Sequence, residues 1–370
     1  MISVAGASGN VGRLVVKELV RMGLAHIRLG GRNQHALFEI AEEVPYADIF
    51  PFDLTCERDS VRFCEGSSVV VNCAGPSYII LDRLAHAASV ASAPYVDASG
   101  DYPVYKLLLA RQTSCSALLS AGVLPGLSGL VPRWMAKGFD HPNNLSTYVG
   151  GLERCSTAST IDMLLSMDGK REPHGEPLAG WRSGRKASKA LRPAKNLEVP
   201  FVPDRVNAYP FFSIESERLA CDLRLNNCDF WNIFAGEKLI DTFIQQMGGD
   251  FSEDHLGQAL EDLNQAATLD LLGRKPYYML VFQMDGVANG EAVSRTVALR
   301  THDAYRLIAT MTALTALALV EGKATEGIGF AAEMVDPDWA VSVLRQSPSL
   351  DAFEIADRRY GENAIEEGVI

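Results

Sequence analysis

The sequence predicts an α/β protein with a doubly wound parallel sheet in its first part and a second α/β domain that holds a mixed sheet. Three observations lead to this fold class. The chain opens on a strand, a glycine-rich turn and a helix, in that order. Strand-like and helix-like segments then alternate from residue 2 to about residue 120, which is typical of a parallel sheet. After Pro142 the pattern changes to one that suits antiparallel strands.

The opening segment predicts a phosphate-binding turn. Ile2 to Ala5 is a short apolar run typical of a buried strand, and Gly6, Gly9 and Gly12 follow it at three-residue spacing. In such a turn the first glycine allows the bend, the second lets a pyrophosphate approach, and the third lets helix and strand pack closely. The helix that follows offers free N–H groups to the anion. A turn that needs glycine for its geometry alone is the alternative.

Within this turn, the candidate cofactor-binding residues are Gly6, Ser8, Gly9, Asn10, Val11 and Gly12.

The end of the second strand indicates which dinucleotide binds. Ile27 to Leu29 predicts this strand, and Arg32 and Asn33 follow its end, with no acidic residue before Glu39. An acidic residue at this position binds the 2′-hydroxyl of NAD, whereas an arginine accommodates the 2′-phosphate of NADP. Because a guanidinium donates two hydrogen bonds to a phosphate, Arg32 favours NADP, and Asn33 is a further candidate cofactor-binding residue. A solvated surface arginine is the alternative.

The remaining elements of the first domain follow in order. A third strand is expected over Ala47 to Phe52, with Asp53 at its end beside the adenine. The next elements are a strand over Ser68 to Asn72, a helix near Ile80 to Ala91, a strand over Pro94 to Val96, a helix near Val104 to Thr113, a strand over Ser116 to Leu119 and a helix after Leu124 to Pro132 that ends by Gly138. Small residues after the fourth strand let the backbone pass close to the nicotinamide, so the candidate contacts there are Asn72, Ala74, Gly75 and Pro76.

The second domain is expected to carry antiparallel strands. Ser146 to Leu152 predicts one strand, and Tyr277 to Asp285 with Ala292 to Arg300 predicts a hairpin whose turn holds Gly286, Asn289 and Gly290. Lys170 to Pro210 reads as loops and short strands, and a helix over about Ala304 to Glu321 is expected to return to the first domain. The predicted boundaries are 1–130 for the dinucleotide-binding domain, 131–301 for the substrate domain and 302–370 for a C-terminal helical segment.

Composition narrows the class of protein. The net charge of −12 argues against a nucleic-acid binder, and the longest apolar run, Ile308 to Val320, is too short to span a bilayer. A strand that begins at residue 2 leaves no room for a signal peptide, and the 7 cysteines are scattered, so we expect a cytoplasmic protein. No histidine or cysteine spacing suits a metal, so no metal site is expected.

Several motifs together resemble the saccharopine dehydrogenase family. They are Gly6 to Gly12, Gly31 to Asn33, Val70 to Pro76, Tyr95 to Asp101, Ala121 to Ser128 and Tyr148 to Leu152, with Glu326 to Gly329 near the C-terminus. The resemblance implies a Rossmann domain and a nicotinamide cofactor. Members of this family reduce or oxidise C–N bonds of amino-acid-derived secondary amines, and others act on C=C bonds. Residues 155–275 show no such resemblance.

The expected reaction site lies beyond the carboxyl ends of the parallel strands. Three segments meet there, namely Cys73 to Tyr78, Asp97 to Tyr102 and Leu124 to Ser128. The candidate catalytic residues are Asp101, Tyr102 and Tyr78, and the candidate substrate residues are Ser77, Asp97, Pro125 and Gly126. Asp101 as a helix N-cap and Tyr78 as a core residue are the alternatives. Pro125 and Gly126 are expected to place a helix N-terminus where it can receive a substrate carboxylate.

A basic segment stands out against the acidic chain. Between Trp181 and Lys195 there are six basic residues and no acidic one, among them Arg182 and Arg185. One interpretation is a cationic lid that receives an anionic substrate or an acidic partner such as a carrier-protein domain, with Trp181 as a stacking surface. A solvated loop is the alternative.

Together these observations predict an NADP-dependent oxidoreductase that acts on a small-molecule substrate, anionic or carrier-bound, and works as a homodimer. The favoured reaction is reduction of an imine formed from an amino compound and a carbonyl compound. Two alternatives stay open, a reductase of C=C bonds in a biosynthetic intermediate and a non-catalytic NADP-binding sensor.

Overall fold

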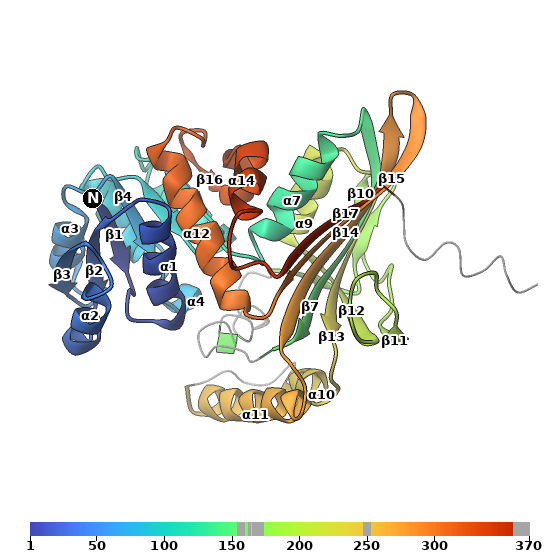
Figure 1. The fold of residues 1–370 in the computed structure, drawn as a ribbon, viewed down its shortest axis with the longest axis horizontal. Coiled ribbons are helices and arrows are strands. Elements are labelled where there is room, and N and C mark those ends of the chain that lie inside the picture. The colour runs from blue at the N-terminus through green and yellow to red at the C-terminus, as the bar shows by residue number, and fades with distance from the viewer. Residues whose placement is uncertain (154–159, 162–163, 165–173, 247–252, 358–370) are drawn as a thin grey trace, which may run out of the picture. The chain divides into compact units, whose positions relative to one another are not determined.

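A computed structural model of the chain describes all residues except 154–159, 162–163, 165–173, 247–252 and 358–370 (Figure 1). The chain forms two compact units. The first unit combines Met1–Leu130 with Ala304–Ser349, and the second combines the described residues of Val131–Asp303 and Leu350–Ile370. Each unit is therefore built from two stretches of chain that are distant in sequence.

The first unit is built on a parallel sheet. Its described strands are β1 (Ile2–Ala5), β2 (His26–Gly31), β3 (Tyr46–Pro51), β4 (Val69–Asn72), β5 (Tyr95–Asp97), β6 (Ala117–Leu119) and β16 (Ile328–Phe330). Their order across the sheet is β16-β6-β5-β4-β1-β2-β3, and every pair is parallel. The strand order reverses between β1 and β4, which is the point where open α/β sheets bind ligands. This sheet confirms the predicted doubly wound fold.

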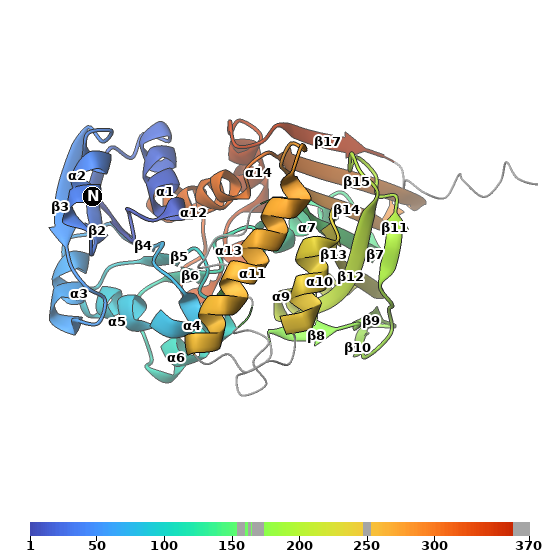
Figure 2. The same cartoon turned by 90° about the horizontal axis from the view of Figure 1, so that it is seen from below.

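Helices cover both faces of this sheet. They are α1 (Asn10–Arg21), α2 (Gln34–Ala41), α3 (Glu57–Cys64), α4 (Ser77–Ile80), α5 (Arg83–Val90), α6 (Tyr102–Ala110), α12 (Ala304–Val320), α13 (Ala331–Met334) and α14 (Pro337–Leu344). Figure 2 shows α1, α2 and α12 on one face and α3, α5 and α6 on the other. Because helices cover both faces, the central strands β1, β4, β5 and β6 are buried along their whole length, whereas β3 at the sheet edge is partly exposed.

The packing of α1 against α12 follows from their sequences. In α1, Val15, Val16 and Leu19 are buried on one side at helical spacing. In α12 almost every side chain from Leu307 to Ala318 is buried, so this helix has no solvated face of any width. The two helices lie side by side (Figures 1 and 2), so the apolar segment after residue 303 is a buried helix of the first unit.

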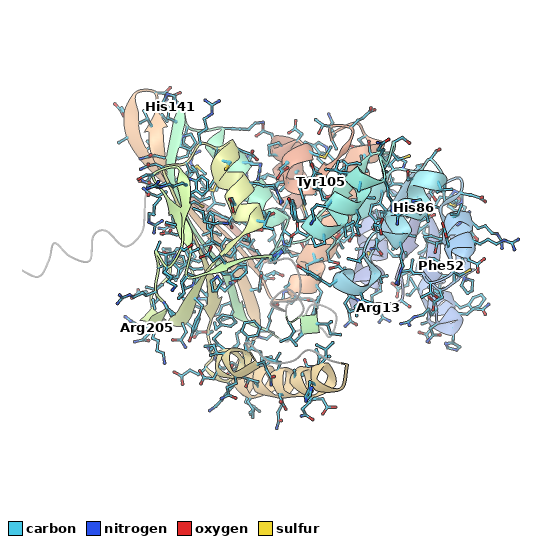
Figure 3. All side chains as sticks on the ribbon, turned by 180° about the vertical axis from the view of Figure 1, so that it is seen from behind. Arg13, Phe52, His86, Tyr105, His141 and Arg205 are labelled. Atoms are coloured by element: carbon cyan, nitrogen blue, oxygen red, sulfur yellow. The ribbon has the colours of Figure 1, made fainter. Side chains whose placement is uncertain are left out.

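Two features of the first unit differ from the prediction. The helix expected near Ile80 to Ala91 is present as α5, but the short helix α4 before it was not predicted. Leu81, with a φ of 49°, separates the two helices. The last strand of the sheet, β16, was not predicted. It pairs with β6, and its Phe330 packs against Tyr105 with 5.1 Å between ring centroids (Tyr105 is labelled in Figure 3).

The second unit is built on a mixed sheet. Its described strands are β7 (His141–Leu152), β8 (Gly175–Pro177), β9 (Gly180–Arg182), β10 (Arg185–Ala187), β11 (Ala194–Leu197), β12 (Val206–Ser213), β13 (Asn227–Phe234), β14 (Tyr277–Ala288), β15 (Glu291–Thr301) and β17 (Ala352–Ala356). The main path is β10-β9-β13-β7-β14-β15-β17, and β12 pairs with β13, β11 and β8. Only β13 and β7 run parallel on this path, which confirms the predicted mixed sheet.

The predicted hairpin is present, with a shorter turn. Only Asn289 and Gly290 connect β14 to β15, and both have positive φ, as a tight hairpin turn requires. Gly286, which was expected in the turn, lies within β14 opposite Val293. The strand β17 was not predicted either. It pairs with β15, so part of the expected C-terminal helical segment is a strand of the second unit.

The described helices of the second unit are α9 (Ile214–Asp222), α10 (Lys238–Gln246) and α11 (Glu253–Leu271), while α7 (Leu127–Ala136) crosses the boundary between the units. α10 and α11 pack together through Leu239, Phe243, Ala259 and Leu263. Among all the helices described here, none combines the length and the apolar character that a membrane crossing requires.

The C-terminal return to the first unit gives a testable prediction. Phe330 is 3% exposed in the core that includes Tyr95 and Phe63, so Phe330→Ala removes a buried ring. We expect a loss of about 3–5 kcal/mol in the free energy of unfolding, which lowers Tm by on the order of 10 °C. Phe38→Ala is the control, since Phe38 is 53% exposed. Equal Tm values for Phe330→Ala and the unchanged protein would mean that β16 does not contribute to the first unit.

Candidate functional site

The glycine turn leaves no room for side chains at two positions. Gly6 has a φ of 72°, and a Cβ there would come within 2.7 Å of the Ala74 backbone nitrogen. A Cβ on Gly12 would come within 2.0 Å of the Gly6 carbonyl oxygen. Gly9 is exposed, and a Cβ there would meet only the Gly6 oxygen, at 3.2 Å. Gly6 and Gly12 therefore allow β1, β4 and α1 to pack closely, whereas Gly9 keeps an open side.

The N-terminus of α1 presents unused hydrogen-bond donors. Gly9 is its N-cap, so no side chain caps the helix, and the first turn has no acidic residue. Within the described chain, the N–H groups of Asn10, Val11 and Gly12 donate to no acceptor. Helix N-termini with free N–H groups and a positive dipole end bind phosphate groups.

Three residues surround the end of β2. Arg32 is exposed and makes no ion pair with any described residue. The Ser8 hydroxyl lies beside the strand end, 3.5 Å from the position of a Cβ on Gly31. The side chain of Asn33 accepts a hydrogen bond from the Ala36 N–H at 3.2 Å and so caps α2. Arg32 and Ser8 are thus available to a ligand, while Asn33 already has a structural partner.

Asp53 lies in the loop after β3. Its carboxylate accepts hydrogen bonds at 2.8 Å from both the N–H and the hydroxyl of Thr55. These bonds, together with the nearby charge of Arg32, lower the pKa of Asp53. The aspartate is therefore a fixed negative charge near Arg32.

A buried carboxylate connects the strand ends on the other side of β1. Asp97 is 1% exposed and accepts hydrogen bonds from the Tyr95 hydroxyl at 2.5 Å and from the Asn72 side-chain amide at 3.0 Å. Its other oxygen accepts from the N–H groups of Ser99 and Gly100, at 3.0 and 2.6 Å. Burial and the charge of Asp97 raise the pKa of Tyr95, which keeps the phenol protonated as the donor.

This network also fixes the loop after β4. The side-chain oxygen of Asn72 accepts a hydrogen bond at 3.1 Å from the Ala74 N–H. Asp97 therefore orients Asn72, and Asn72 in turn orients the backbone at Ala74, Gly75 and Pro76. Asn72 was predicted as a cofactor contact and Asp97 as a substrate contact. In the structure both side chains are buried and support the loop after β4 through hydrogen bonds.

One pocket of the first unit brings three predicted residues together. Its lining residues are Ser77, Tyr78, Leu81, Asp101, Pro103 and Val104. Asp101 is 5% exposed and stands at the N-cap position of α6, but its side chain does not cap the helix. Its carboxylate accepts a hydrogen bond at 3.1 Å from the hydroxyl of Ser120. The helix-cap alternative for the Asp101 side chain is therefore wrong.

The third predicted catalytic residue lies outside this group. Tyr102 stacks on Tyr105 with 6.2 Å between ring centroids, and the Lys106 ammonium lies 5.5 Å from its ring centre. It belongs to the edge of the core rather than to the lining of the pocket.

The start of α7 differs from the start of α1. The N–H groups of Leu127 and Ser128 donate to the carbonyl oxygens of Gly122 and Val123, both at 3.0 Å. Pro125 and Gly126 precede this helix as predicted, but the loop itself already uses the first donors. Fewer N–H groups therefore remain for a substrate carboxylate than the sequence suggested.

The basic segment forms strands of the second unit. Arg182 makes two hydrogen bonds to Asp229, whereas Arg185 is exposed on β10. Trp181 is 6% exposed, donates its indole N–H to the Leu225 carbonyl and stacks on Phe212. The expectation that Trp181 offers a stacking surface to a ligand is wrong, because the fold already covers its ring.

Ser120 was not predicted as part of the site. It is fully buried with a φ of 55°, a conformation that costs energy for a residue other than glycine. It follows β6 directly, as Cys73 follows β4, and the rule that places ligands beyond the strand ends would have found it. Among the described side chains, no group of three or more His, Cys, Asp or Glu is arranged to hold a metal ion.

Comparisons with known proteins bear on the fold. No protein-family model matches the chain, and no curated protein matches its sequence. The structure resembles the apo form of saccharopine dehydrogenase (L-Glu forming) from Saccharomyces cerevisiae, with a TM-score of 0.67 and 12% identity over 97% of this chain and 99% of that chain. A probable dehydrogenase from Thermotoga maritima gives a TM-score of 0.46 with 10% identity, over 92% of this chain and 93% of the other.

A Rossmann-fold NAD(P)-binding family protein from Shigella flexneri matches 32% of this chain and 64% of its own length, with 14% identity and a TM-score of 0.25. At these identities only the fold is comparable, and the yeast enzyme matches both units with a TM-score above 0.5. The described residues adopt a saccharopine dehydrogenase-like fold, as the sequence motifs predicted.

Proposed function

We propose that this protein is an NADP-dependent oxidoreductase that reduces the C=N bond of an imine derived from an amino compound. The observation that carries the proposal is the start of α1, where three N–H groups without acceptors stand beside the bare backbone of Gly9. A pyrophosphate fits such a position, because its oxygens accept these hydrogen bonds and its charge meets the positive end of the helix dipole.

The residues around β2 support NADP rather than NAD. Arg32 is exposed and unpaired in the described structure, and the Ser8 hydroxyl lies beside the same strand end. A guanidinium and a hydroxyl both donate to a 2′-phosphate, whereas no carboxylate stands at the end of β2 to accept from a 2′-hydroxyl. The charge of Asp53 is held by Thr55, so it does not neutralise Arg32 through a direct ion pair.

When bound, NADPH supplies the hydride for the reduction. The chain must then deliver one proton to the imine nitrogen and exclude water. Asp101 is the group we assign to this proton transfer, because it lies in the pocket with Ser77 and Tyr78, at the end of the loop that joins β5 to α6. Ser120 acts as a positioning residue that holds the carboxylate through its hydroxyl.

The choice of an imine rests on the fold shared with a saccharopine dehydrogenase, an enzyme that forms glutamate. A pooled screen tests it. NADPH oxidation is followed in the presence of imines generated from amino acids and oxo acids, and in parallel with a pool of enones. Turnover with imines alone supports the proposal, and turnover with enones alone replaces it with C=C reduction. Tight NADPH binding with no turnover in either pool indicates a sensor.

Cofactor selectivity gives the first prediction. Arg32→Ala removes a charge-assisted hydrogen bond worth about 1.5–3 kcal/mol, so the Kd for NADPH should rise roughly ten- to a hundredfold. The Kd for NADH should hardly change, because NADH has no 2′-phosphate. Titration by cofactor fluorescence measures both values. Equal weakening of the two cofactors would assign Arg32 a structural role.

The glycine turn gives a second prediction with a built-in control. Gly9→Val should leave Tm nearly unchanged, since the added side chain meets only one backbone atom, but it should abolish binding of both cofactors. Gly12→Ala should instead lower the stability of the free protein by about 1–3 kcal/mol through overpacking against Gly6. Thermal melts without cofactor, followed by titration, separate the two effects. Normal NADPH binding by Gly9→Val would move the phosphate site elsewhere.

The proton transfer gives a third prediction. Asp101→Asn should lower kcat by about 10²–10⁴-fold and leave the Kd for NADPH unchanged. Asp82→Asn is a matched control, because Asp82 is also a buried N-cap aspartate whose side chain does not cap its helix, and it pairs with Arg111. It should cost stability but not kcat. Similar kcat values for both variants would exclude Asp101 as the proton donor.

A further inference from the structure

One edge of the sheet in the second unit carries a row of cations. β7 pairs with β13 along its whole length, from Asn227 to Phe234. β9 and β12 also pair with β13, so both lie on the side of β13 that faces away from β7. β10 pairs outside β9, and β11 pairs outside β12, so both lie on the outer side of this edge (Figure 2). We define the basic edge as Arg185, Lys189, Arg192 and Lys195, from β10, the following loop and β11.

The basic edge is charged and unneutralised. Its four side chains are exposed, and none of them forms an ion pair with a described residue. The other two cations of the segment are paired, Arg182 with Asp229 and Lys186 with Glu217. No acidic residue occurs between Gly180 and Leu197, although the whole chain has 46 acidic and 34 basic residues. The segment from Gly180 to Leu197 therefore has a net positive charge, although the chain as a whole has a net negative charge.

The arrangement of these cations costs stability. Arg185 pairs directly across the strands with Arg182, and like charges at such positions repel. Lys189 has a φ of 53°, which also costs energy for a residue other than glycine. A function that uses the cations accounts for both costs.

We propose that the basic edge docks an acidic, extended segment of a partner protein. Carboxylates complement the four cations, and the outer side of β10 has no neighbouring strand in the described structure, so it leaves backbone groups open to an extended chain. A nucleic acid is less suited, since the one tryptophan of the segment is buried and offers no stacking surface. A membrane is less suited because no large apolar side chain between Gly180 and Leu197 is exposed.

A labelled poly-L-glutamate peptide tests the proposal by fluorescence anisotropy. It should bind the unchanged protein at low salt and weaken steeply towards physiological salt, where the Debye length is about 8 Å. The triple change Arg185→Gln, Lys189→Gln and Arg192→Gln should raise the Kd about tenfold, since three exposed ion pairs are each worth about a factor of two. NADPH binding should stay the same, so failure here is separate from failure of the proposed function.

A matched variant controls for net charge. This second triple variant combines Lys238→Gln, Lys275→Gln and Lys323→Gln. The three lysines are exposed, form no ion pair in the described structure and lie outside the basic edge. The variant should leave the Kd for poly-L-glutamate nearly unchanged. Equal weakening in both triple variants would overturn the proposal, as would tighter binding of a single-stranded oligonucleotide or of phosphatidylserine vesicles than of the peptide. A third outcome would also overturn the proposal: the unchanged protein does not bind the peptide, and the first triple variant aggregates. The cations would then serve only to keep the sheet edge from pairing with other chains.

Discussion

The organisation of the candidate site depends on the buried carboxylate of Asp97. Moving a charge out of water is costly, and here four donors from Tyr95, Asn72, Ser99 and Gly100 compensate for it. These donors belong to β4, β5 and the loop after β5, and the Asp97 carbonyl accepts from the Ala121 N–H beyond β6. The Asp97 side chain therefore fixes the loops after β4 and β5, and its carbonyl group adds a contact to the loop after β6.

Two helix starts in the first unit show how the same local pattern leads to different chemistry. Glycines precede both α1 and α7, and both follow strand ends of the parallel sheet. In α1 the first N–H groups have no acceptor, whereas in α7 the preceding loop folds back and its carbonyl groups accept from Leu127 and Ser128. The difference comes from the path of the loop before each helix, which the residue types in the sequence do not predict.

Long apolar patterns were sufficient to predict most strands of the first unit and the central hairpin of the second. β1 spans the predicted residues, and β14 and β15 extend the predicted pair. β16 and β17 were missed because they are short and pair with strands distant in sequence, which local periodicity does not detect. For the site, sequence placed Ser77, Tyr78 and Asp101 near each other, but the burial of Trp181 depends on Phe212 and Leu225, which only the fold brings to it.

The late position of β16 in the sequence has a consequence for biosynthesis. Residues 1–130 leave the ribosome long before Ile328 to Phe330, so during synthesis β6 has an open edge and α1 lacks its neighbour α12. An open strand edge pairs readily with other chains, and a nascent protein in this state is a substrate for chaperones. A chain cut after residue 150 would stay in that state, so a minimal version of the first unit has to join residues 1–130 to 304–349.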